Sequence, residues 1–146
     1  MKSSTILKIS CGVILFHLLG HSIGHFTWKD TDDAGLLDII SKMYSHQFEF
    51  MGKTQTLGGH HDGYSLLFAV TLTMLTAITW IASGQIDTAR QIKAMLMVTG
   101  IALLFCGVIE MIYFFPLAGG TSLLAGAMHY FVYLRETISR RAVQNA

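Results

Sequence analysis

Four long apolar stretches, with most of the charged residues between them, dominate this chain of 146 residues. They cover residues 6–28, 64–83, 94–115 and 121–134. A helix needs about 20 mostly apolar residues to cross a bilayer, and other backbone conformations leave polar groups unsatisfied in hydrocarbon. The pattern therefore predicts an all-α membrane protein, a bundle of four transmembrane helices in a single domain.

The segment "FFPLAGG" separates the third stretch from the fourth. Pro116 lacks a backbone donor, and Gly119 and Gly120 adopt the conformations that tight turns require. We expect a turn here that folds the third and fourth helices into a close antiparallel hairpin.

Residues 29–63 join the first two stretches and are long for a simple loop. Within them, the apolar residues of "LLDIISKMYSHQFEFM" recur at helical spacing, with polar residues between them. This periodicity predicts an amphipathic helix over residues 36–51 that lies on the membrane interface.

The distribution of charged residues predicts the orientation of the chain in the membrane. Charged residues make up 13% of the chain, about half of the soluble average of roughly 25%, and no block of like charge suggests nucleic-acid binding. Basic residues favour the cytoplasmic side of a membrane protein. With both termini cytoplasmic, that side carries Lys2, Lys8, Lys93, Arg90, Arg135, Arg140 and Arg141, and the other side carries only Lys29, Lys42 and Lys53. We therefore expect both termini in the cytoplasm.

The first stretch contains "FHLLGHSIGHFTW", which places His17, His21 and His25 four residues apart. On a helix these residues drift by only about 40° per step, so they form a stripe along one side. Gly20 and Gly24 lie beside the stripe, and small residues four apart let membrane helices approach closely. The two glycines are therefore predicted to pack against another helix, with the histidines turned inward.

Ionisable groups inside a membrane are costly and indicate a functional site. Counting helical rise from the inner ends places Glu110, on the third stretch, about level with His21. His25 then lies near the outer boundary, where "GGHHDG" brings His60 and His61. Imidazoles and a carboxylate suit zinc, iron or copper, so His21, His25, Glu110, His60 and His61 are predicted metal ligands in the outer half of the bundle.

Three further residues extend this prediction. Tyr113, one turn beyond Glu110, and His17 are assigned to the second shell or to a pathway through the bundle. Asp62 either orients a neighbouring histidine or caps the second helix. Haem is a weaker alternative cofactor, because His129, the histidine of the fourth stretch, is expected about 8 Å nearer the inner boundary than His17.

Two segments resemble a family of small, uncharacterised four-pass bacterial integral membrane proteins. In "FEFMGKTQTLGGHHDGYSLLF" the second helix is entered through a polar stretch and the pair Gly63 and Tyr64. In "YFFPLAGG" the third helix ends in Phe114 and Phe115 before Pro116. The resemblance implies a location in the bacterial cytoplasmic membrane and assigns no activity.

The sequence leaves three functions open. The first is a polar His/Glu site that binds a metal for redox or hydrolytic chemistry. The second is a pathway for protons, ions or small solutes along the histidine stripe, since imidazole titrates near neutral pH. The third is a non-catalytic accessory subunit. In each case the bilayer is the first partner, and a larger membrane complex or a homo-oligomer is the second.

Overall fold

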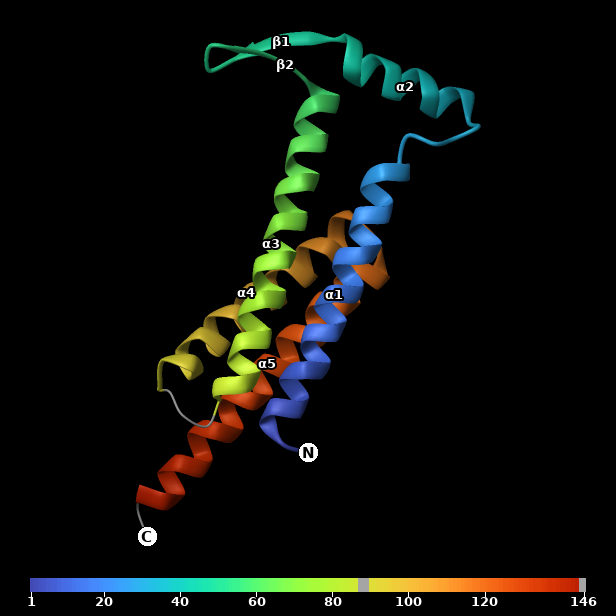
Figure 1. Cartoon of the computed structure of the whole chain (residues 1–146). Coiled ribbons are helices and arrows are strands. Elements are labelled where there is room, and N and C mark those ends of the chain that lie inside the picture. Colours follow the sequence, from blue (N-terminus) through green and yellow to red (C-terminus); the bar gives the residue numbers. More distant parts are fainter. Residues whose placement is uncertain (87–89, 145–146) are drawn as a thin grey trace. The chain divides into compact units, whose positions relative to one another are not determined.

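The computed structural model describes residues 1–86 and 90–144, which form five helices and one two-stranded sheet. The elements are α1 (Ser3–Thr27), α2 (Ala34–Ser45), β1 (Gln47–Phe50), β2 (Lys53–Thr56), α3 (Leu57–Gln85), α4 (Arg90–Tyr113) and α5 (Pro116–Gln144) (Figure 1). They divide into two compact units. Unit 1 comprises Met1–His17 and Leu72–Ala146, and unit 2 comprises Leu18–Thr71.

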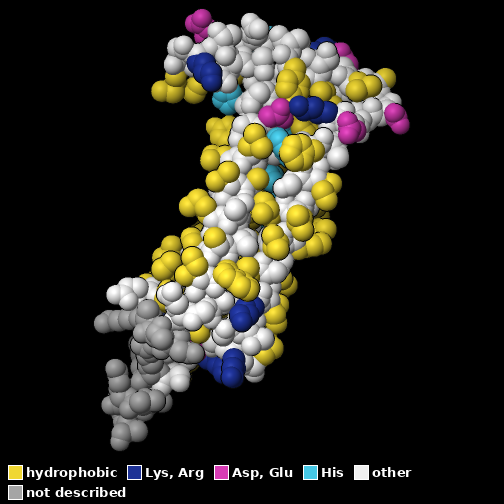
Figure 2. All heavy atoms as spheres, viewed as in Figure 1, with side chains coloured by type: hydrophobic (Ala, Val, Ile, Leu, Met, Phe, Trp, Pro, Cys, Tyr) yellow, Lys and Arg dark blue, Asp and Glu magenta, His cyan; other side chains and the backbone are white. Residues whose placement is uncertain are grey.

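Among the described residues, three helices are long and apolar enough to cross a membrane: Ser3–Thr27, Leu57–Gln85 and Gln91–Tyr113. At most 33% of the residues in their apolar windows are buried within the molecule. Figure 2 shows hydrophobic side chains over much of the visible surface of these helices. Apolar helices that leave most of their side chains exposed are solvated by lipid, so the structure is consistent with an integral membrane protein. These helices correspond to the first three predicted spans.

Helices α4 and α5 lie side by side as an antiparallel pair (Figure 1), as the sequence predicted. The predicted position of the turn was wrong. Pro116 is the first residue of α5, where its missing N–H costs no hydrogen bond, and only Phe114 and Phe115 connect the helices. Gly119 and Gly120 lie inside α5 because the helix starts at the proline.

Glycines bring α4 and α5 into close contact. A Cβ atom added at Gly107 would lie 2.8 Å from the backbone nitrogen of Leu123 and 3.0 Å from the carbonyl oxygen of Gly119. A Cβ atom added at Gly126 would lie 2.9 Å from the carbonyl oxygen of Gly100. Side chains at these positions would push the two backbones apart, so the glycines set the distance between the helices.

Gly20 and Gly24, which the sequence predicted to pack against another helix, do not have this role within the chain. A Cβ atom at either position meets nothing within 4 Å among the described residues, and both glycines are exposed. The neighbouring face of α1, which carries the half-buried His21 and His25, is the one that contacts α3, so packing of the two glycines against a helix of another protein stays a prediction.

The core of unit 1 lies between α1, α3, α4 and α5. Its apolar cluster consists of Ile6, Leu7, Ala82, Ile86, Ile92, Leu96 and Val132. Beside it, the ammonium of the buried Lys93 donates to the carbonyl oxygen of Glu136 at 2.6 Å. The hydroxyl of Ser3 donates to the Glu136 carboxylate, also at 2.6 Å. These contacts join the first residues of α1 to α4 and α5.

In unit 2 the predicted helix over residues 36–51 is too long. Helix α2 begins after Asp33, whose carboxylate accepts from the backbone N–H of Gly35 and Leu36 at 2.8 and 3.1 Å, and it ends at Ser45. The next residues, "QFEF", alternate polar and aromatic positions with the period of a strand, and they form β1. The helical spacing of Phe48 with the preceding apolar residues was therefore coincidental.

Strands β1 and β2 form an antiparallel hairpin that pairs Gln47 with Thr56 at one end and Phe50 with Lys53 at the other. The hairpin and α2 run across the direction of the first turns of α3 (Figure 1). Gly58 holds α2 against this junction, because a Cβ atom there would lie 2.7 Å from the ring of Tyr44.

Candidate functional site

Polar side chains of the apolar helices gather in three clusters. The Glu110 cluster consists of His17, Glu110 and Ser122 in unit 1. The His129 cluster consists of Ser10, Thr79 and His129, also in unit 1. The Ser65 cluster consists of His21, His25 and Ser65 in unit 2.

In the Glu110 cluster, α1 supplies the imidazole, α4 the carboxyl and α5 the hydroxyl. His17 Nδ1 lies 3.1 Å from Ser122 Oγ, and His17 Nε2 lies 3.5 Å from Glu110 Oε1. The side chains of His17 and Glu110 are each only 6% exposed. Neither Glu110 oxygen makes a hydrogen bond to a described residue. The His17 imidazole and the Ser122 hydroxyl are the polar groups beside this carboxyl, and of the two only an imidazole exchanges protons near neutral pH.

In the His129 cluster both ring nitrogens have partners. Nδ1 lies 2.8 Å from the carbonyl oxygen of Ala125, which can only accept, so Nδ1 carries a hydrogen. Nε2 lies 3.0 Å from the hydroxyl of Thr79, which lies 2.7 Å from the carbonyl oxygen of Leu75. The hydroxyl can donate to Nε2 of a neutral ring or to Leu75 when Nε2 is protonated. A haem ligand needs a free ring nitrogen, and His129 offers none.

The two clusters of unit 1 share one sequence pattern. Helix α1 carries a serine and a histidine seven residues apart, Ser10 and His17, and α5 repeats this spacing with Ser122 and His129. Seven residues are about two helical turns, so each pair lies on one face. His17 contacts Ser122, and His129 lies 3.2 Å from Ser10 Oγ. The sequence reasoning missed Ser10, Ser122 and the role of His129, although the repeated spacing was a signal for all three.

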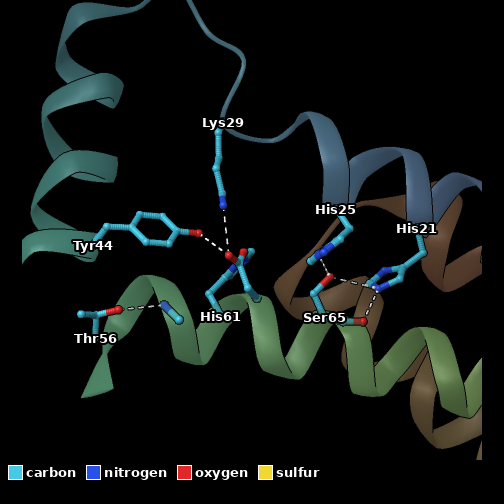
Figure 3. A network of polar contacts seen from close by, with 9 residues as sticks. His21, His25, Lys29, Tyr44, Thr56, His61 and Ser65 are labelled. Atoms are coloured by element: carbon cyan, nitrogen blue, oxygen red, sulfur yellow. Dashed lines mark hydrogen bonds and ion pairs between the residues drawn. The ribbon is translucent and has the colours of Figure 1, made fainter. Parts of the chain in front are cut away.

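The Ser65 cluster has a defined hydrogen-bond direction (Figure 3). His21 Nε2 lies 2.9 Å from the carbonyl oxygen of Ser65, so this nitrogen carries a hydrogen, and it lies 3.2 Å from Ser65 Oγ. The same hydroxyl lies 2.9 Å from His25 Nδ1 and donates to it in the neutral ring. Ser65 therefore links two imidazoles that sequence reasoning assigned to a metal.

A fourth polar group is centred on Asp62, the sixth residue of α3, and includes Lys29 and Tyr44, which are labelled in Figure 3. Its carboxylate accepts from the ammonium of Lys29 at 3.0 Å and from the phenol of Tyr44 at 2.6 Å. The Tyr44 phenol and the Asp62 carboxylate raise the pKa of Lys29. Burial, followed by the hydrogen bond to Asp62, raises the pKa of Tyr44 above its ordinary value of 10.0. The group ties α2 to the ends of α1 and α3.

Comparisons with protein-family models, with curated proteins and with solved structures found no match. The function of this chain is therefore inferred from the geometry of its polar clusters.

The five predicted metal ligands do not converge. Across residues 1–86 and 90–144, no three His, Cys, Asp or Glu side chains are placed to hold one metal ion. Glu110 belongs to unit 1, where His17 contacts it, and His21 and His25 share Ser65 in unit 2. The sequence estimate of depth paired Glu110 with His21 rather than with His17, because it assumed that the first and third helices start at the same depth.

The other predicted site residues take separate positions. His60 lies among aromatic rings, with its ring centroid 5.8 Å from that of Phe48. His61 packs on Trp28 at 4.4 Å, and its Nδ1 lies 3.7 Å from Asp62 Oδ1. At this distance Asp62 makes no hydrogen bond to His61, so its role in orienting a histidine stays a prediction. Helix α3 starts at Leu57, so Asp62 does not cap it. Tyr113 is 76% exposed and does not join the Glu110 cluster.

Proposed function

We propose that this chain is a four-span protein of the bacterial cytoplasmic membrane that binds and releases protons at the Glu110 cluster, as a step in proton movement or proton-coupled transport. The observation that carries the proposal is the buried pair of Glu110 and His17, in which His17 Nε2 lies 3.5 Å from Glu110 Oε1.

The fourth span is the apolar part of α5. Residues 117–134 contain no Asp, Glu, Lys or Arg, and they extend for about 27 Å as a helix, close to the hydrocarbon thickness of a bilayer. The seven basic residues on the side of the two termini support a cytoplasmic location for both. Reporter fusions at the two termini and in the segment between α1 and α3 test this topology.

The chemistry of the pair suits reversible proton binding. A lone buried carboxylate is costly, so the pair favours states without net charge. Two such states exist: neutral His17 with protonated Glu110, and imidazolium with carboxylate. In both, Nδ1–H donates to Ser122, and a single proton moves between Glu110 Oε1 and His17 Nε2. One further proton gives the pair a positive charge, which it must release to return to its resting state.

The first test is proton flux into liposomes of phosphatidylethanolamine and phosphatidylglycerol, driven by a potassium diffusion potential and read by a trapped pH-sensitive dye. We expect flux through the full chain, with most of it lost in Glu110→Gln and in His17→Gln. The control is Glu49→Gln, which neutralises an exposed carboxylate of β1 and keeps the flux. Folded wild-type protein with no more flux than empty liposomes would overturn the proposal.

The second test reads the proton itself. The infrared band of a protonated carboxyl group is expected to disappear in Glu110→Gln and to shift in His17→Gln, and to stay unchanged in Glu49→Gln. Metal analysis of the same samples separates the alternatives, because stoichiometric zinc, iron or copper that is lost on replacing His21 would favour the metal site that the sequence suggested.

A further inference from the structure

The hairpin of unit 2 has two chemically different faces. Paired residues of antiparallel strands point to the same side of the sheet, and successive residues alternate sides. The register therefore gives one polar face and one face that carries both phenylalanines. The polar face consists of Gln47, Glu49, Thr54 and Thr56, and the aromatic face consists of Phe48, Phe50, Lys53 and Gln55.

The aromatic face is turned toward the first turns of α3. The ring of His60 lies 5.8 Å from that of Phe48 and 6.1 Å from that of Phe50, and the ring of Tyr64, about one turn further along α3, lies 5.9 Å from that of His60. Helix α3 continues from these residues into its apolar span, and it begins directly after the last residue of β2. The aromatic face is therefore on the side of the hairpin from which α3 continues toward the bilayer.

The tip of the hairpin is strained and apolar. Met51 has a φ of 52° and Gly52 a φ of 79°, and such two-residue turns usually have asparagine, aspartate or glycine in the first position. A methionine in the left-handed region costs about 1–2 kcal/mol, and its side chain is 91% exposed here. Phe50 beside it is 53% exposed. In water, the exposed side chain of Met51 gains little burial that could offset the strain of its backbone.

We propose that the hairpin lies flat on the lipid interface. The side chains of Phe50 and Met51 enter the boundary between headgroups and acyl chains, the ammonium of Lys53 reaches the phosphates of anionic lipids, and the polar face stays in water. Lipid is the expected contact of the hairpin, because the exposed Leu57 and Tyr64 of α3 continue the apolar surface from the hairpin into the span. The inference is independent of proton binding at Glu110.

The experiment measures the depth of spin labels in vesicles of phosphatidylethanolamine and phosphatidylglycerol. Labels are attached to Met51→Cys and, as the matched control on the polar face, to Thr54→Cys, both in a full chain with Cys11 and Cys106 replaced by serine. The ratio of oxygen accessibility to accessibility for a water-soluble nickel reagent is expected to be several-fold higher at position 51. Replacing phosphatidylglycerol with phosphatidylcholine, or making Lys53→Gln, is expected to lower the ratio at position 51.

Two results would overturn the proposal. Equal ratios at positions 51 and 54 mean that the tip is in water, and protection from both reagents means that protein covers it, either a second copy or another subunit. If the serine background does not fold, Met51→Trp and Glu49→Trp in the native chain give the same comparison. Brominated lipids are then expected to quench the former well beyond the shared background of Trp28 and Trp80, and equal quenching contradicts the proposal.

Discussion

Replacing Gly107 with alanine tests the contact that sets the distance between α4 and α5. The new methyl group would lie 2.8 Å from a backbone nitrogen and 3.0 Å from a carbonyl oxygen, where ordinary contacts start at 3.4 Å. Neither atom belongs to a side chain that can rotate away, so the helices must separate by several tenths of an ångström. Overpacking of this kind costs about 1–3 kcal/mol, and alanine returns up to about 1 kcal/mol through its better helix propensity. We expect a net loss of about 1–2 kcal/mol.

The matched control is Gly24→Ala, because a Cβ atom there meets nothing within 4 Å. It keeps the gain in helix propensity and adds no clash, so we expect its stability to equal or exceed that of the wild type. Both variants are unfolded reversibly by denaturing detergent in mixed micelles, and circular dichroism follows the loss of helix.

Equal stabilities of Gly107→Ala and Gly24→Ala would contradict the role of Gly107 in setting the distance between α4 and α5. A loss of stability in Gly24→Ala with none in Gly107→Ala would restore the packing role that the sequence suggested for the histidine-bearing face of α1. Gly126→Ala gives an independent check, since its methyl group would lie 2.9 Å from the carbonyl oxygen of Gly100.

Three further predictions concern single polar groups. The pKa of Tyr44 is higher in the folded chain than its ordinary value of 10.0. The protonated phenol therefore stabilises the fold at pH values below 10.0, and this stabilisation is lost as the pH rises through the pKa of the folded chain. Phenolate absorbance should show a titration above pH 10.0 that Tyr44→Phe removes. Thr79→Val removes the hydroxyl that contacts Nε2 of the buried His129, so the free energy of unfolding should fall by about 1–3 kcal/mol. The control Thr71→Val, at an exposed position of α3, should change the free energy of unfolding little. Asp33→Ala removes the cap of α2 at a cost of about 1 kcal/mol, and faster hydrogen exchange of the two capped amides would report it, while unchanged exchange would contradict the capping role.

Patterns within a single segment were sufficient to predict much of the fold. The apolar stretches predicted the three helices that are able to span a membrane, and Pro116 correctly marked the reversal between α4 and α5. A helix was predicted after Asp33 and is present, but its end was placed too late, and its position on the membrane interface stays a prediction. The alternation of "QFEF" and the pair Met51 and Gly52 held the missing information, which the helical spacing of the apolar residues obscured.

The polar contacts were harder to predict, because they depend on how distant helices are aligned. The sequence correctly marked His17, His21 and Glu110 as unusual, since an ionisable group in an apolar helix stands out without any knowledge of the fold. It could not select the partner, because a shift of one turn along α1 exchanges His21 for His17 opposite Glu110. Ser65 and Ser122 carry no charge and give no signal of this kind.

The sequence alone determined which segments are apolar helices, because the transfer of a segment into hydrocarbon depends on its own side chains. Only the tertiary structure decided which helices pack most closely and which polar groups meet. The glycines of α4 and α5, rather than those of α1, allow close approach, because a contact requires complementary surfaces on both helices. The same need for complementary surfaces places His17 beside Glu110. It also leaves His21 and His25 in the Ser65 cluster, apart from His17.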